Sequence, residues 1–209
     1  MNAFRVVAGC FLMLLSGCAS WNGAHTHADP PASWASITIK GQASRLLGIP
    51  VQVGQPLPST VLVDAITMKK VDLAQMKGKV LLLSIVPSLD TKVCEAQTHY
   101  LGEQGEKLPA DIIRVTVSRD TPFAQKLFAE EAKLKALTYL SDYRESSFGR
   151  ATGLLVEENM LLARTIIIVD KDGIVRYLQI VPELSNLPNM DEAFKYADDI
   201  AKRKNKETP

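Results

Sequence analysis

The chain has 209 residues, with 24 Lys and Arg against 23 Asp and Glu, for a net charge of +1. This balance gives no electrostatic reason to expect a nucleic acid partner, because such surfaces need an excess of positive charge. Hydrophobic residues make up 46% of the sequence, which is enough for the core of one sizeable domain.

The N-terminus has the pattern of an export signal. Arg5 precedes a short apolar stretch, residues 6–15, and small residues lead to Cys18. The stretch is too short to span a bilayer. Residues 15–18 (Leu-Ser-Gly-Cys) resemble a bacterial lipoprotein signal, in which cleavage precedes the cysteine and that cysteine is lipidated. The alternatives are an uncleaved anchor or a plain signal peptide, and the domain is exported in each case.

Cleavage would divide the chain into three parts: a signal peptide at 1–17, the lipidated Cys18 with a tether at 18–35, and a folded domain at 36–209. We therefore expect a membrane protein of the bacterial cell envelope, lipid-anchored in the outer membrane and facing the periplasm. Cys10 would leave with the signal and Cys18 would become a thioether. Cys94 would then be the only thiol, so no intramolecular disulfide is possible and the core must supply the stability.

The tether is rich in polar and helix-breaking residues and shows no apolar period. His25 and His27 form a His-x-His pair that could bind a metal, but histidines in such a linker are more often solvated. We predict no metal site in this chain, and no cofactor.

The expected elements alternate from residue 37 onward. Strands are expected at residues 37–40, 49–53, 60–63, 80–86, 112–117, 138–140, 164–169 and 174–181. Helices are expected at residues 95–106, 122–135, 146–152 and 190–204. The first two strands could pair as a hairpin, and a Lys-Asp-Gly turn at 171–173 joins the last two.

This order predicts an α/β fold: a central mixed β-sheet flanked by helices, preceded by an N-terminal β-hairpin. The sequence of elements matches a thioredoxin-like architecture.

Cys94 lies between the apolar strand at 80–86 and a segment that can be helical. The first helical turn offers the positive end of the helix dipole and free backbone N–H groups, which favour the reactive thiolate. Cys94 is therefore a candidate nucleophile, and the alternative is a small buried hydrophobic side chain.

The residues around Cys94 carry a family resemblance. Pro87, Thr91 and Cys94 match the Pro-x-x-x-Thr-x-x-Cys pattern of peroxiredoxins. Segments that resemble the thiol peroxidase branch of that family lie at 87–94, 120–125, 140–144 and 163–170. The N-terminal hairpin is also typical of this branch, and the resemblance extends from about residue 37 to the C-terminal helix.

The resemblance implies a thiol peroxidase that reduces hydrogen peroxide and organic hydroperoxides, in antioxidant defence and redox homeostasis. Cys94 would be the peroxidatic cysteine, oxidised from thiolate to sulfenic acid. Thr91 would orient the peroxide, although it could also cap the helix. Pro87 would shield the thiolate from water, and Arg164 would hold thiolate and peroxide with directed N–H donors.

Other side chains are weaker candidates for these roles. Arg119, Arg144 and Arg150 are alternative cations, and Arg164 itself could be a surface charge. His99 follows Cys94 by five residues and should not face the thiol on a regular helix, so we expect a structural or exposed side chain rather than a general base.

One position departs from the family pattern. The thiol peroxidase branch commonly carries a resolving cysteine on the helix that begins at Pro122, and here Ala129 occupies that place. Reduction of the Cys94 sulfenic acid would then need an external thiol, from a thioredoxin-like protein or a small molecule. A mixed disulfide, or an intersubunit disulfide in a homodimer, is also possible.

Two other functions stay open at this point. A peroxide-responsive redox sensor or binding protein is favoured by the missing resolving cysteine and disfavoured by the retained Pro87, Thr91 and Arg164. A disulfide oxidoreductase fits poorly, because the sequence has no Cys-x-x-Cys pair.

Overall fold

The computed structural model describes Met1 and residues 36–203. The predicted signal peptide, the lipidation site Cys18, the tether and both of its histidines lie outside these residues, so the expectations for them stay predictions. Within the described part of the chain, no helix has the length and apolar character needed to cross a bilayer.

The centre of the fold is a mixed sheet of seven strands. In spatial order these are β10 (Val175–Ile180), β9 (Thr165–Val169), β5 (Val80–Ile85), β6 (Ile112–Ser118), β7 (Leu137–Ser141), β3 (Leu62–Asp64) and β4 (Lys70–Val71). Strands β5, β6 and β7 run parallel, and the other pairings are antiparallel. The prediction of a central mixed sheet is confirmed.

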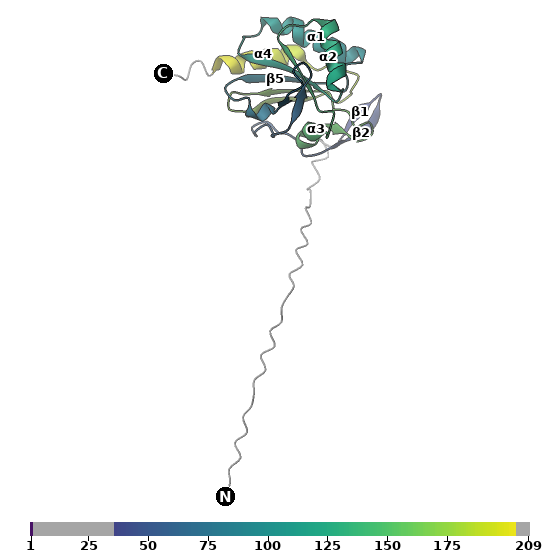
Figure 1. Ribbon diagram of the computed structural model, residues 1–209, viewed down its shortest axis with the longest axis vertical. Helices are drawn as coiled ribbons and strands as arrows, with labels where there is room; N and C mark the ends of the chain where they lie inside the picture. The colour runs from purple at the N-terminus through teal and green to yellow at the C-terminus, as the bar shows by residue number, and fades with distance from the viewer. Residues whose placement is uncertain (2–35, 204–209) are drawn as a thin grey trace, which may run out of the picture.

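Helices cover both faces of this sheet. Helices α1 (Lys92–Glu103), α2 (Pro122–Ala132) and α4 (Met190–Arg203) lie on one side, and α3 (Ser147–Thr152) lies on the other with the β1–β2 hairpin (Figure 1). Every residue of β5 is buried, because Leu82 packs in the cluster of α1 and α4 while Leu83 packs in the cluster of α3 and the hairpin. A strand covered on both faces needs a continuous apolar run, which is what the sequence shows.

The N-terminal hairpin exists, but its predicted pairing was wrong. Strand β1 (Ser36–Ile39) pairs with β2 (Gln42–Leu47) and not with residues 49–53. Lys40 and Gly41 form the turn with φ values of 52° and 79°, the positive values that a type I′ turn requires.

Residues 49–53 form a loop against α3 instead of a strand. Pro50 lacks an N–H, and the amides of Ile49 and Val51 donate to the carbonyls of Arg150 and Thr152. The hairpin extends on its other edge, where β2 pairs with the short strand β8 (Leu155–Val156).

Helix α1 begins at Lys92, three residues before the predicted start, and ends at Glu103. Two short 3₁₀ helices, η1 (Leu73–Gln75) and η2 (Gln104–Lys107), complete the fold. The earlier start matters because it places Cys94 firmly inside the first turn of α1.

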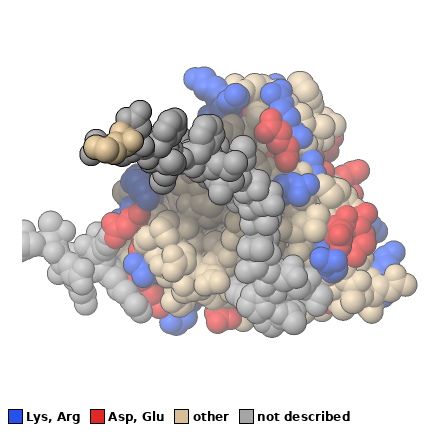
Figure 2. All heavy atoms as spheres, turned by 90° about the horizontal axis from the view of Figure 1, so that it is seen from below, with Lys and Arg blue, Asp and Glu red and all other residues tan. Residues whose placement is uncertain are grey.

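Charged side chains of both signs are interspersed on the face shown in Figure 2, where they surround uncharged surface. The described surface seen from this side has no single-sign patch, in keeping with the near-neutral sequence.

Candidate active site

A short loop carries the chain from the centre of the sheet to Cys94. Strand β5 ends at Ile85, the buried Pro87 follows, and Thr91 is the N-cap residue of α1. Cys94 is the third residue of the helix, and the amides of this first turn have no carbonyl partner within the helix. The thiol side chain is only 1% exposed, so bulk water is largely excluded from it.

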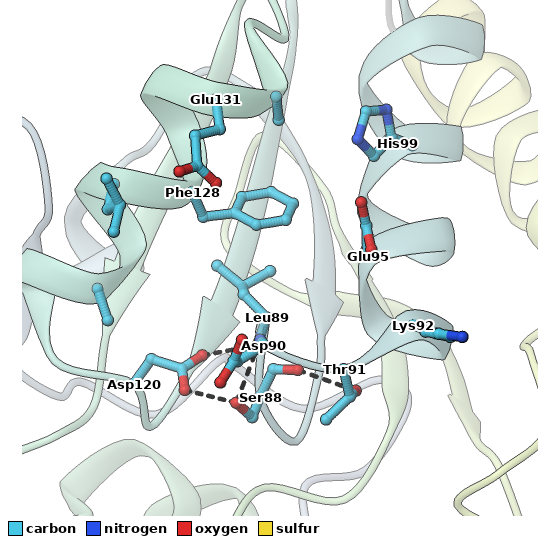
Figure 3. Close-up of a pocket in the computed structure, with 13 residues that line it drawn as sticks. Ser88, Leu89, Asp90, Thr91, Lys92, Glu95, His99, Asp120, Phe128 and Glu131 are labelled. Atoms are coloured by element: carbon cyan, nitrogen blue, oxygen red, sulfur yellow. Dashed lines mark hydrogen bonds between the residues drawn. The ribbon is translucent and has the colours of Figure 1, made fainter.

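Asp120 fastens this loop to the end of β6. One carboxylate oxygen accepts a hydrogen bond from the Ser88 hydroxyl at 2.7 Å, and the other accepts from the Leu89 amide at 2.7 Å (Figure 3). The hydroxyl of Ser118 donates to the same carboxylate at 2.7 Å. The loop before Cys94 is therefore held by charge-assisted hydrogen bonds.

Arg164 reaches the thiol from the neighbouring strand. The register pairs Ile85 of β5 with Thr165 of β9, so Arg164 lies beside the start of the loop. Its Nη2 donates to the Cys94 Sγ at 3.4 Å. The guanidinium is 2% exposed, and its Nε donates to the Leu184 carbonyl at 2.9 Å. The strand pairing thus joins two residues that are 70 positions apart in the sequence.

Gln97 is a site residue that the sequence reasoning missed. Its Oε1 accepts from Arg164 Nη1 at 2.7 Å, and its Nε2 donates to the Ser84 hydroxyl at 2.7 Å. The side chain is fully buried. Its place three residues after Cys94, hence on the same helix face, is the signal that could have identified it.

The charge of Arg164 lacks a carboxylate partner in the described part of the chain. Its hydrogen-bond partners are a carbonyl, an amide oxygen and the Cys94 sulfur. A buried cation without an anion is costly, so a negative sulfur beside it is stabilised. The N-terminus of α1 acts on Cys94 in the same direction.

The other predicted site residues have different surroundings. Thr91 caps α1 with its backbone only, because its exposed hydroxyl donates to the Ser88 carbonyl at 3.1 Å. Arg119 donates to three backbone carbonyls, Arg144 lies over the ring of Tyr143, and Arg150 is exposed. Of the four arginines considered, Arg164 is the one that the structure brings to the thiol.

A cavity of about 600 Å³ lies between α1 and α2, beside the loop. Cys94 and Arg164 are not among its lining residues. His99 lines it, with its ring centroid 6.3 Å from that of Phe128 and its Nδ1 2.9 Å from a Glu103 carboxylate oxygen.

Ala129 lies on α2 and packs on a small hydrophobic cluster that includes Cys94, Leu89 and Tyr139. Cys94 is the one cysteine in the described part of the chain, and it is a free thiol. The structure therefore puts an alanine methyl against the cluster that contains the thiol, at the position where the family pattern has a second cysteine.

Tyr139 contributes a buried polar atom to this cluster. Its hydroxyl finds no hydrogen-bond partner among the described residues, and burial raises the pKa of Tyr139 to about 12. The phenol therefore stays protonated at neutral pH.

A carboxylate holds the segment that carries the Leu184 carbonyl. Glu183 accepts hydrogen bonds from the amides of Lys40 and Gly41 at 3.0 Å each and from the Thr38 hydroxyl at 2.8 Å. The hydrogen bond from the Gly41 amide, followed by those from the Ser185 and Thr38 hydroxyls, lowers the pKa of Glu183 to about 2. The N-terminal hairpin is thereby tied to the chain that positions Arg164.

Residues 36–203 contain no group of three or more His, Cys, Asp or Glu side chains arranged to hold a metal ion. The chemistry that the described site offers is that of a shielded thiol beside a cation and a helix N-terminus.

Comparison with known proteins gives relatives of one kind. The Redoxin family profile matches residues 52–194. The chain is 40% identical to the thiol peroxidase of Bacillus subtilis (strain 168) over 169 residues, which cover 80% of this chain and 99% of that protein. It is 43% identical to the thiol peroxidase of Halalkalibacterium halodurans over 164 residues, covering 78% and 97%.

Solved structures agree with the sequence relatives. The crystal structure of a peroxiredoxin-like protein from Aquifex aeolicus superposes with a TM-score of 0.75 at 33% identity, covering 79% of this chain and 97% of that one. A thiol peroxidase from Chromobacterium violaceum superposes with a TM-score of 0.67 at 18% identity, a likeness of fold.

Proposed function

Because the chain belongs to the Redoxin family, and within it to the thiol peroxidase branch of the peroxiredoxins, we propose that Cys94 is its peroxidatic residue. Thiol-dependent peroxide reduction is the activity of this enzyme. The observation that carries the assignment of Cys94 is its contact, at 3.4 Å, with the guanidinium of the buried Arg164.

The oxidation step follows from this geometry. The Cys94 thiolate attacks one peroxide oxygen, the O–O bond breaks, and the other oxygen leaves as water or an alcohol after taking a proton. The products are a Cys94 sulfenic acid and the reduced peroxide. Arg164 and the free amides of the first turn of α1 offer fixed donors to the charge that develops on the leaving oxygen, with little reorganisation.

Thr91 and Pro87 have supporting roles in this proposal. The Thr91 hydroxyl, which donates to the Ser88 carbonyl, would turn to donate to the bound peroxide. Pro87 is buried in the loop and brings no N–H that would compete for the thiolate.

The return step needs a thiol from outside the chain, because Ala129 stands at the resolving position. One thiol condenses with the sulfenic acid to give a mixed disulfide and water, and a second thiol releases Cys94. In a homodimer, a disulfide between two Cys94 residues would be a second route, visible as a covalent dimer on non-reducing gels.

The experiment that tests this function follows Cys94 by mass spectrometry after one equivalent of hydrogen peroxide. The wild-type protein should gain one oxygen at Cys94 while the peroxide disappears. Cys94→Ser should neither consume the peroxide nor gain the oxygen. Rapid peroxide loss in Cys94→Ser would assign the chemistry to another group.

A sensor with little turnover is the second candidate, favoured by the single observation that Ala129 replaces the resolving cysteine. The two functions differ in the second turnover. With excess thiol, a peroxidase consumes many equivalents of peroxide, whereas a sensor stops after one.

We also propose that the enzyme acts at the bacterial envelope, anchored by a lipid on Cys18 and facing the periplasm from the outer membrane. The support is the sequence pattern at residues 15–18. Radiolabelled palmitate should label the wild-type protein in growing cells and should fail to label Cys18→Ser. Equal labelling of both proteins would contradict the proposed lipid anchor at Cys18.

A further inference from the structure

The cavity of about 600 Å³ between α1 and α2 lies beside the site: Thr91 lines it, whereas Cys94, Arg164 and Pro87 do not. Two of its lining residues, Leu89 and Phe128, belong to or pack on the same hydrophobic cluster as Cys94. In Figure 3, Phe128 and Glu131 on α2 lie opposite Glu95 and His99 on α1. We call this cavity the α1–α2 groove. It is an open surface feature that shares Leu89 with the hydrophobic cluster that contains the reactive sulfur.

The groove combines an apolar floor with an acidic rim. Leu127 is 57% exposed at its wall, although it is a large hydrophobic residue. Its lining carboxylates are Asp90, Glu95, Asp120 and Glu131, and Lys92 is its lining lysine. Asp120 is engaged by the loop, whereas the other three carboxylates are exposed and form no ion pair with a described cation.

We propose that the α1–α2 groove binds the external thiol reductant, and that this reductant is a protein thiol with positively charged residues beside its cysteine. The inference rests on the proposed function, since only a sulfenic acid at Cys94 needs such a partner. A groove of this size accepts a segment of several residues, more than a single small thiol fills. Its exposed carboxylates attract cationic partners and repel anionic ones.

The chemistry balances with the partner as the reductant. The partner's thiol attacks the Cys94 sulfenic sulfur, an S–S bond forms, and the hydroxyl leaves as water with the thiol proton. A second thiol of the partner then attacks the mixed disulfide on the partner's own sulfur. Cys94 leaves as the thiol. The partner ends as a disulfide, having given up the two electrons that reduce the sulfenic acid to thiol and water.

The test separates the reduction step from the oxidation step. Full-length protein is oxidised with one equivalent of hydrogen peroxide, and the gain of one oxygen at Cys94 is verified by mass spectrometry. Reduction is then followed with two peptides of equal length, each with one cysteine and one leucine, flanked by lysines in one and by glutamates in the other. The measured quantity is the ratio of the two rate constants.

The decisive variant is Glu95→Gln with Glu131→Gln, and the control is Glu130→Gln. Glu130 is exposed on the same helix and pairs with Lys126 at 3.9 Å, outside the groove. The lysine-to-glutamate ratio should fall about tenfold in the double variant at low salt, and should stay at the wild-type value in the control. The intrinsic reactivities of the two peptides cancel when the ratio is compared between variants, because both peptides are tested with every variant.

Leu127→Asn tests the apolar wall without a change in charge. It should slow both peptides by about the same factor and leave their ratio unchanged. The groove is not the binding site if the lysine-to-glutamate ratio stays at the wild-type value in the double variant. The same conclusion follows if the ratio falls equally in Glu130→Gln. Cysteamine, a small cationic thiol, tests the size of the partner. If it reduces Cys94 as fast as the lysine peptide, and is slowed equally by the double variant, the proposal that the partner is a protein is wrong. Failure to form the sulfenic acid at all overturns the proposed function and this inference with it.

Discussion

The two sides of Cys94 differ in almost every physical respect. On the inner side, the network of Arg164, Gln97 and Ser84 is fully buried, and the hydrogen bonds that join them are 2.7 Å long. On the outer side, the α1–α2 groove is open and rimmed by exposed carboxylates. The inner side has a fixed cation beside the thiol, and the outer side has carboxylates and no cysteine among its lining residues.

This difference assigns the two halves of the reaction to two kinds of structure. Oxidation of Cys94 needs donors that are in place before the charge develops, and a buried network supplies them with little reorganisation. Reduction needs a molecule that arrives and leaves, and an exposed groove allows that exchange. Substitutions on the inner side should therefore alter the first half, and substitutions on the outer side the second half.

The largest expected effect comes from breaking the inner side. Arg164→Ala should slow oxidation of Cys94 by about 10²- to 10³-fold, as measured by stopped flow, because fixed donors to the thiolate and peroxide are lost. Arg164→Lys should recover little, because a point charge cannot donate to Gln97, Leu184 and the sulfur together. An unchanged rate in Arg164→Ala would show that Arg164 takes no part in the oxidation of Cys94.

The next prediction concerns a variant with a cysteine at the family's resolving position. Ala129→Cys should form a disulfide with Cys94 after oxidation, because both positions lie at the same cluster and a tethered thiol acts at a high effective concentration. Mass spectrometry should find the disulfide in place of the sulfenic acid. Ala124→Cys is the matched control, because Ala124 lies on the same helix and lines the α1–α2 groove but is not among the residues that pack on the Cys94 cluster. Persistence of the sulfenic acid in Ala129→Cys would show that the two positions do not meet.

A smaller effect should come from the support behind Arg164. The pKa of Glu183 falls from 4.5 to about 2, so its hydrogen bonds stabilise the fold fully above about pH 4.5 and are lost as the pH falls toward 2. Urea unfolding should find Glu183→Gln less stable than the wild type at pH 7, with the gap narrowing between pH 4.5 and 2. A gap that stays constant through this range would mean that the carboxylate charge contributes nothing.

The smallest effect, on stability, is expected at Tyr139 in the hydrophobic cluster that contains Cys94. Tyr139→Phe removes a buried hydroxyl that no described residue hydrogen-bonds, so it should leave the stability unchanged or raise it by up to about 1 kcal/mol. Tyr100→Phe is the control, because the Tyr100 hydroxyl donates to Asp191 and its removal should bring no gain. A clear loss of stability in Tyr139→Phe would point to a polar partner for that hydroxyl.

The sequence predicts the inner side better than the outer side. Cys94, Pro87 and Thr91 stand at fixed short spacings, and the apolar run at 80–86 places them after a buried strand. Arg164 lies far away in the sequence and was expected from the family resemblance alone. Gln97 was missed because its partners lie outside α1, Ser84 on β5 and Arg164 just before β9, although helical spacing puts it on the face of Cys94.

Other features could not be predicted because they depend on packing between distant segments. Residues 49–53 have the composition of a strand, but their amides bond to the end of α3. The Lys40–Gly41 turn sets the hairpin instead, and its signal is weak because lysine seldom adopts a positive φ. The α1–α2 groove depends on the distance between two helices, which no local pattern encodes.

The central claim is that Cys94 reacts rapidly with peroxide because the buried network of Arg164 and Gln97 lies beside it. Stopped-flow measurement of the second-order rate constant for oxidation of Cys94 by hydrogen peroxide tests it most directly. Positioning together with fixed donors predicts a constant at least about 10³-fold above that of free cysteine. A constant no larger than that of free cysteine would contradict the account.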